Sequence, residues 1–348
     1  MKTRPSGSDD SRTVSDPPSN RPAPTLSAPR TPGPPRVSVV IAAHTRVQFL
    51  KRAVRSAASQ GPEEVVVVKF TRDEELDREL TAMGATVWVT RELYQGGKVA
   101  DGIEHSTGDA VILLDDDDVL LPGKVSRVRE VFSDPRVVFY SNRYVPFTET
   151  PPERGDVGPV RLFKTGEENQ YRNGLKPVLT SCLTVRRGMI APWLGELRQL
   201  TIADHTVFMM AVAARQWMAM DSSVLTAYHV SEVNGALRPA QSIWFRPGAS
   251  AQRDITWMLD LLDRETGGVR ETLTPVVAAA VIHLVFLTGE TQFRDYRRTM
   301  RAILDGVGVR RPLTIPSTLM FGYPLSPRLA IRLNRVWKSL VGYHHHQG

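Results

Sequence analysis

The sequence predicts an α/β protein with a mostly parallel β-sheet between helices, followed by a helical C-terminal extension. Two observations carry this prediction. From residue 36 onward, short apolar runs alternate with stretches whose apolar residues recur at helical spacing. After about residue 250 the strand-like runs stop, and only the helical spacing continues. Alternation of this kind indicates right-handed βαβ units in the first part of the chain.

The first part contains five expected strands, each a short run rich in valine, isoleucine or leucine. They are residues 37–41, 64–69, 86–89, 110–114 and 137–141. Four expected helices alternate with them, at residues 47–59, 73–83, 98–106 and 122–132. Gly84 should end the second helix, because glycine adopts a left-handed conformation easily. Pro122 should begin the fourth, because proline suits a first turn.

The later elements are less regular. A segment rich in Pro, Glu and Gly predicts a loop at 144–173. Beyond it we expect strands at 177–185 and 223–230 and a helix at 204–217, then C-terminal helices at 255–262, 273–287 and 294–304. The last segment is a basic amphipathic helix, with leucine and valine on one face and arginine and lysine opposite. Such a helix either packs on the domain or lies on an anionic membrane surface.

Composition restricts the partners and the compartment. The net charge of +7 comes from the two ends, because residues 1–36 carry six basic and three acidic side chains and residues 292–348 carry ten and two. The acidic centre argues against nucleic acid as a substrate. The single cysteine, Cys182, excludes an internal disulfide and fits a reducing compartment. Residues 1–36 lack an apolar core and predict a disordered tail.

No apolar stretch reaches the roughly 18 residues that a membrane span needs; the most apolar, residues 275–288, is shorter. We therefore expect a cytoplasmic protein, with peripheral contact at the inner membrane face through the terminal helix. The expected organisation is a tail at 1–36, a domain at 37–235 and a helical extension at 236–348.

Four consecutive aspartates, Asp115 to Asp118, follow the expected strand 110–114. They should emerge at the sheet edge where open α/β proteins bind ligands. Carboxylates packed there repel one another unless a cation relieves them. Mg²⁺ commonly uses one or two carboxylates together with substrate phosphates. The run therefore predicts a metal–diphosphate site, and the alternative is a solvated acidic turn.

Four blocks of the sequence together resemble the inverting family 2 glycosyltransferases of the GT-A fold, a Rossmann-like nucleotide-diphospho-sugar transferase fold. The likeness extends over about residues 37–235. The blocks are Val37-Ser-Val-Val-Ile-Ala-Ala-His-Thr-Arg46, Gly97-Lys98 with Ser106-Thr-Gly-Asp109, Leu114-Asp-Asp-Asp-Asp118 with Pro122, and Ala203-Asp204-His205.

The resemblance implies transfer of a sugar from a nucleoside diphosphate sugar to a glycan or lipid-linked acceptor, with Mg²⁺ or Mn²⁺ as cofactor. It places Asp117 and His229 on the metal, Asp115 toward the ribose, and Asp204 as the catalytic base. The full set of implied nucleotide-sugar-binding residues is Ala42, His44, Arg46, Lys98, Asp115, Asp116 and Asp117. Inversion needs one base that takes the proton from the acceptor hydroxyl.

Several of these residues also allow a simpler structural interpretation. Asp204 could be a helix N-cap, His229 could be a packing residue after a strand, and Lys98 could be a solvated lysine at a helix start. Arg46 could lie on the surface of the helix that it precedes.

The sequence departs from the family where the second strand ends. Relatives usually have an aspartate there that grips the nucleotide base, and this chain has Lys69-Phe70. The usual Arg-Asn pair before Gly102 is also absent. Because of these two differences, the sequence does not determine which base and which sugar the donor carries.

Three other classes of protein are alternatives. The string Asp115-x-Asp117 also fits the nucleophile motif of haloacid-dehalogenase-type phosphatases, but that motif normally follows the first strand, and here three strand-like runs precede it. A dinucleotide-binding oxidoreductase is disfavoured because the first strand-to-helix turn has no glycine. A catalytically silent nucleotide-sugar-binding protein is the non-enzyme alternative.

Overall fold

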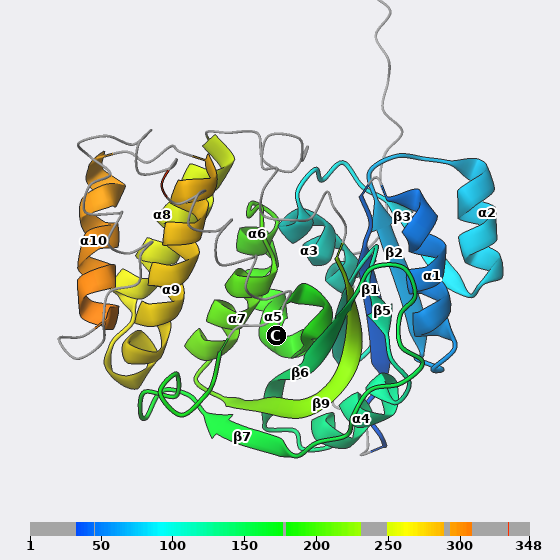
Figure 1. Ribbon diagram of the computed structural model, residues 1–348, viewed down its shortest axis with the longest axis horizontal. Coiled ribbons are helices and arrows are strands. Elements are labelled where there is room, and N and C mark those ends of the chain that lie inside the picture. The colour runs from blue at the N-terminus through cyan, green and yellow to red at the C-terminus, as the bar shows by residue number, and fades with distance from the viewer. Residues whose placement is uncertain are drawn as a thin grey trace, which may run out of the picture. The chain divides into compact units, whose positions relative to one another are not determined.

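The computed structural model describes residues 33–44, 46–176, 179–230, 249–288 and 293–307, together with Leu333 (Figure 1). The chain divides after Gly33, and every element below belongs to the unit that begins at Pro34. The predicted tail at 1–36 lies almost entirely outside the described residues. The predicted terminal basic helix, apart from Leu333, lies outside them as well.

Four parallel strands form one half of the sheet, in the order β3-β2-β1-β4. Their bounds are β1 Val37–Ala42, β2 Glu64–Lys69, β3 Ala85–Val89 and β4 Ala110–Asp115. All six residues of β1 are buried, as expected for a central strand with helices on both faces. Ala42 pairs with Asp115, so the ends of β1 and β4 lie side by side and bring the segments that follow them together.

The other half of the sheet is mixed. β8 (Leu183–Arg186) pairs antiparallel with β4 and with β6 (Val137–Phe147), and β9 (Trp217–His229) runs parallel to β6. β5 (Val119–Leu120) and β7 (Val160–Lys164) pair antiparallel with β9. The predicted α/β class is confirmed, with parallel pairing confined to β3-β2-β1-β4 and to β6-β9. Because Val119 pairs with Ala227, the end of β9 lies beside the aspartate run.

Helices cover both faces of this sheet (Figure 1). One buried cluster joins the strands to α1, α2 and α4, and the other joins them to α3, α7 and the C-terminal helices. The bounds are α1 Val47–Ala58, α2 Glu74–Ala82, α3 Gln95–His105, α4 Lys124–Phe132 and α7 Asp204–Ala213. The Asp73 side chain caps α2 by accepting a bond from the Leu76 amide at 3.1 Å. Gly84 follows with a φ of +91°, as predicted.

The helical extension packs on α7. It consists of α8 (Ala249–Arg264), α9 (Gly267–Thr288) and α10 (Phe293–Val307), drawn yellow to orange in Figure 1. Leucines and valines of α8 and α9 are buried in the same cluster as α7 and the sheet. Among the described residues, no helix is long and apolar enough to cross a membrane.

Some predicted elements were wrong in detail. The segment predicted as a loop at 144–173 contains the end of β6 and all of β7, because these short runs have no clear period in the sequence. The strand predicted at 177–185 is a 3₁₀ turn, Thr180–Cys182, followed by β8, and residues 177–178 lie outside the described residues. Three short elements between β8 and α7 were not predicted: α5 Arg187–Ile190, the 3₁₀ turn Ala191–Trp193 and α6 Leu194–Leu197.

Candidate functional site

The four aspartates form a tight turn at the end of β4, and only Asp115 is appreciably exposed. The Asp118 amide donates to the Asp115 carbonyl at 3.3 Å, which closes the turn. Asp116, Asp117 and Asp118 are each at most 3% exposed. This burial rules out the solvated acidic turn. Because an uncompensated buried carboxylate is costly, these side chains need partners inside the protein.

Arg46 balances two of these carboxylates. Its guanidinium pairs with Asp116 at 2.7 Å and with Asp117. Burial disfavours the charged guanidinium, but Asp116 and Asp117 outweigh it and raise the pKa of Arg46. Asp116 also accepts a bond from the His44 amide at 2.7 Å. The segment after β1 is thereby fastened to the aspartate run, and Arg46 is not simply a surface residue.

Asp118 has a different role from its neighbours. One of its oxygens accepts from the Ser181 hydroxyl at 2.5 Å and the other from the His229 amide at 2.8 Å. Burial, followed by repulsion from Asp117, raises the pKa of Asp118 to about 7. Asp118 therefore ties the end of β9 to the aspartate run from inside the protein.

His229 lies beside Asp117 with its ring held on three sides. Its Nε2 is 3.0 Å from the Thr148 carbonyl oxygen, which can only accept, so Nε2 carries a proton. In the neutral ring Nδ1 is then the lone-pair nitrogen, 3.5 Å from Asp117 Oδ2. The ring also packs on Phe49 and Phe147, with centroids 4.3 and 5.2 Å away. A ring nitrogen next to a carboxylate, with the other nitrogen bonded to a carbonyl, is the usual arrangement of a histidine metal ligand.

Within the described ranges, no group of three or more His, Cys, Asp or Glu side chains is arranged as a metal site. Asp117 and His229 nevertheless fit a divalent cation, because Mg²⁺ commonly takes its remaining ligands from water and substrate phosphates.

Lys98 and His44 form a buried pair next to the aspartates. Lys98 Nζ lies 2.6 Å from His44 Nδ1, and the lysine is only 1% exposed. Burial lowers the pKa of Lys98 to about 8, although Asp116 acts in the opposite direction. Burial, Lys98 and Arg46 together lower the pKa of His44, which is therefore neutral. Lys98 is thus not the solvated lysine that the sequence also allowed.

Asp204 is the first residue of α7 and is not its N-cap. The N-cap position belongs to Ala203, which has no side chain that could accept a bond. Asp204 Oδ1 accepts from the His205 amide at 2.6 Å and lies 2.9 Å from His205 Nδ1. Burial opposes charge on His205, but Asp204 outweighs it and raises the pKa of the imidazole. The carboxylate side chain is 24% exposed and so accessible to a ligand.

Gln95, which the sequence analysis did not single out, connects the two parts of the site. As the first residue of α3, it donates from Nε2 to Asp115 Oδ1 at 2.7 Å and to Thr180 Oγ1 at 3.2 Å. Its Oε1 accepts from the Ala203 amide at 3.1 Å. A lone glutamine at a helix start has no spacing pattern that would reveal such contacts from sequence.

Lys69 and Phe70, which stand where relatives usually have an aspartate, lie at the end of β2. Lys69 is 3% exposed and forms an ion pair with Asp77 of α2. Phe70, in contrast, is 44% exposed. The lysine charge is therefore directed into the protein, and the Phe70 ring is exposed to solvent at this edge.

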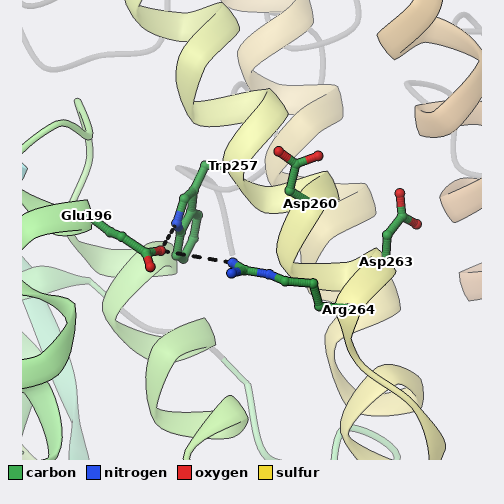
Figure 2. A pocket seen from close by; sticks show the side chains of 5 residues that line it. All are labelled: Glu196, Trp257, Asp260, Asp263 and Arg264. Carbon is green, nitrogen blue, oxygen red and sulfur yellow. Dashed lines mark hydrogen bonds and ion pairs between the residues drawn. The ribbon is translucent and has the colours of Figure 1, made fainter.

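An open cavity of about 570 Å³ lies between α6 and α8, and none of the four aspartates lines it (Figure 2). Its lining residues are Glu196, Trp257, Asp260, Asp263 and Arg264. The Trp257 indole donates to Glu196 at 2.5 Å, and Arg264 approaches the same carboxylate at 4.0 Å. These contacts fasten α6, which precedes Asp204, to the helical extension.

Comparisons with known proteins concern the fold and one segment of the chain. Residues 38–191 match the family described as Glycosyl transferase family 2. Among solved structures, the TarS 1-349 fragment of S. aureus in complex with UDP-GlcNAc has a TM-score of 0.55 and 13% identity, covering 90% of this chain and 92% of that one. The same fragment with UDP has a TM-score of 0.50 and 13% identity, with the same coverage.

The structure titled S. aureus TarS has a TM-score of 0.53 and 12% identity, covering 85% of this chain and 54% of that one. This chain therefore spans about half the length of that protein. No curated protein sequence matches the chain.

The overall fold is the GT-A fold, and the matched segment is similar to glycosyltransferases of that fold. More particularly, the segment that holds β1 to β8 is the part of the chain that matches glycosyltransferase family 2.

Proposed function

We propose that the protein is a metal-dependent inverting glycosyltransferase that moves a sugar from a nucleoside diphosphate sugar to an acceptor hydroxyl. The observation that carries this proposal is that one side chain joins the candidate donor-binding residues to the segment that holds the candidate base. The buried aspartate run lies at the edge of the sheet, and Gln95 joins Asp115 directly to the residue before Asp204. The TarS complexes, which hold UDP-GlcNAc and UDP, support a nucleoside diphosphate donor.

Asp117 and His229 would hold Mg²⁺ or Mn²⁺ at this edge. When bound, the cation neutralises the charge that develops on the leaving diphosphate. Arg46 and Lys98 add two cationic groups next to the same aspartates. The pKa of Lys98, about 8, is above neutral pH, so most of the lysine stays charged. Ala42 and His44 line the edge where the nucleoside would lie, and Asp115 would face the ribose.

Asp204 would act as the base. In an inverting displacement the acceptor hydroxyl attacks the anomeric carbon as the diphosphate leaves, and its proton passes to a carboxylate. His205 fixes the Asp204 carboxylate through two contacts to Oδ1, which limits its rotation. The acceptor in this proposal is a glycan or a lipid-linked sugar, reached in the cytoplasm or at the inner membrane face.

A donor screen tests the first half of the proposal. A ligand that binds only the folded state raises the melting temperature by mass action. We expect one nucleoside diphosphate sugar from a panel to raise the melting temperature with Mn²⁺ present, and to lose most of this effect when the metal is chelated. A flat response across the panel would contradict nucleotide-sugar binding. Binding without any turnover would instead favour a silent binding protein.

Asp204→Asn tests the second half. The amide cannot accept the acceptor's proton, so transfer should fall by at least about 100-fold, with metal-dependent donor binding unchanged in calorimetry. Asp305→Asn, a matched change at an exposed aspartate of α10, should behave like the wild type. Loss of donor binding in Asp204→Asn would mean that Asp204 has a different role, and full retention of transfer would mean that the base lies elsewhere.

A further inference from the structure

The Gln95 carboxamide is bonded at both ends to parts of the site that carry different functions. Asp115 Oδ1, an acceptor, receives its amide hydrogen, and the Ala203 amide, a donor, gives to its oxygen. These two partners leave only one orientation of the carboxamide, because exchanging its oxygen and nitrogen would break both bonds. Ala203 is the N-cap of α7, so its amide lies outside the hydrogen bonds within that helix, and the Gln95 oxygen is its acceptor.

We propose that Gln95 is a positioning residue that sets the distance between the donor-side carboxylate Asp115 and the base Asp204. The inference rests on the proposed function for the roles of these two carboxylates. Glutamine acts here through its neighbours and has no contact with the reacting atoms in this proposal.

The segment before Asp204 is held on both sides, so a shift at Gln95 would be transmitted to the base. On one side the backbone of Gly96 packs directly against the carbonyl oxygens of Leu197 and Leu200. On the other side Asp254 of α8 accepts the Thr201 amide through both carboxylate oxygens, at 3.0 and 3.1 Å. Gln95 is the contact that relates this segment to the aspartate run.

No other side chain of similar size supplies both bonds. Glutamate keeps an acceptor for the Ala203 amide but places a carboxylate against Asp115. Leucine keeps the approximate shape and loses both bonds. This difference separates bridging from simple capping of α7, because a capping role needs only the acceptor.

The test uses the full chain with UDP-GlcNAc and Mn²⁺ as probe. For Gln95→Leu we expect kcat for UDP release to fall about 10- to 100-fold, the loss typical of a misplacement of about 1 Å, with KM and UDP affinity within about threefold. Gln95→Glu should lose as much. Gln199→Ala, at an exposed glutamine of the α6–α7 segment, should match the wild type. A wild-type kcat in Gln95→Leu overturns the proposal, and a wild-type kcat in Gln95→Glu alone reduces Gln95 to a cap.

A second measurement does not need activity. Hydrogen exchange of the Ala203 amide should quicken by about fivefold or more in Gln95→Leu, the effect of losing one net hydrogen bond. Unchanged exchange there overturns the positioning role even if the wild type does not turn over UDP-GlcNAc. An inactive wild type with quickened exchange in the variant would instead count against the donor assignment alone.

Discussion

Replacing Gly96 by alanine should misplace the segment that carries Asp204. A Cβ at Gly96 would lie 2.5 Å from the Leu197 carbonyl oxygen and against that of Leu200. Since ordinary contacts begin at 3.4 Å, either α3 or the α6–α7 segment must move by at least about 0.9 Å. Backbone atoms cannot swing aside as a flexible side chain can. Because a misplacement of about 1 Å can cost about 100-fold in rate, we expect kcat to fall between 10- and 100-fold in Gly96→Ala.

The assay is donor turnover with Mn²⁺, together with the melting temperature of each variant. Gly195→Ala is the matched control, because Gly195 lies in neighbouring α6 and an added Cβ there meets nothing within 4 Å. Its helix should even gain up to about 1 kcal/mol from the better helix former. If Gly96→Ala and Gly195→Ala turn over donor at equal rates, the position of the segment does not control the reaction.

Two further predictions concern single side chains. His229→Ala should raise the Mn²⁺ concentration for half-maximal UDP binding by at least about tenfold, and an unchanged Mn²⁺ dependence would reduce His229 to packing against Phe49. Asp254 is fully buried, and burial raises its pKa to about 7, against opposing hydrogen bonds from Thr201. A raised carboxyl pKa stabilises the fold at low pH and loses that stability as the pH rises from about 4 to 7, by at most about 4 kcal/mol. In urea unfolding Asp254→Asn should therefore lose this downward slope; a slope of the opposite sign in the wild type would mean that the Thr201 bonds dominate.

The sequence was sufficient for the first half of the sheet because local pattern and tertiary role agree there. The strands around Val39 and Ile112 are apolar at all positions but one each, as is typical of parallel central strands. The second half resisted prediction because its strands are defined by pairing. β5 is a two-residue strand that exists only because Val119 and Leu120 meet β9, and β7 shows little alternation of its own.

The candidate site divides in the same way. Asp117, His229 and Arg46 could be proposed from motif likeness, and the structure brings them together. Four adjacent aspartates look equivalent in a sequence, so nothing in the motif distinguishes the internal role of Asp118. Gln95 acts through contacts to residues far along the chain, and its importance becomes visible only once α3 and α7 are packed.

The bond from the His229 amide to Asp118 spans 111 positions along the chain. Contacts of such separation form late in folding, because closing a long loop costs entropy before any contact repays it. Partly folded chains would consequently have the aspartates without their histidine. If Asp117 and His229 bind the cation as proposed, affinity for Mn²⁺ would report the docking of β9, and a nascent chain would acquire it only after β9 has been synthesised.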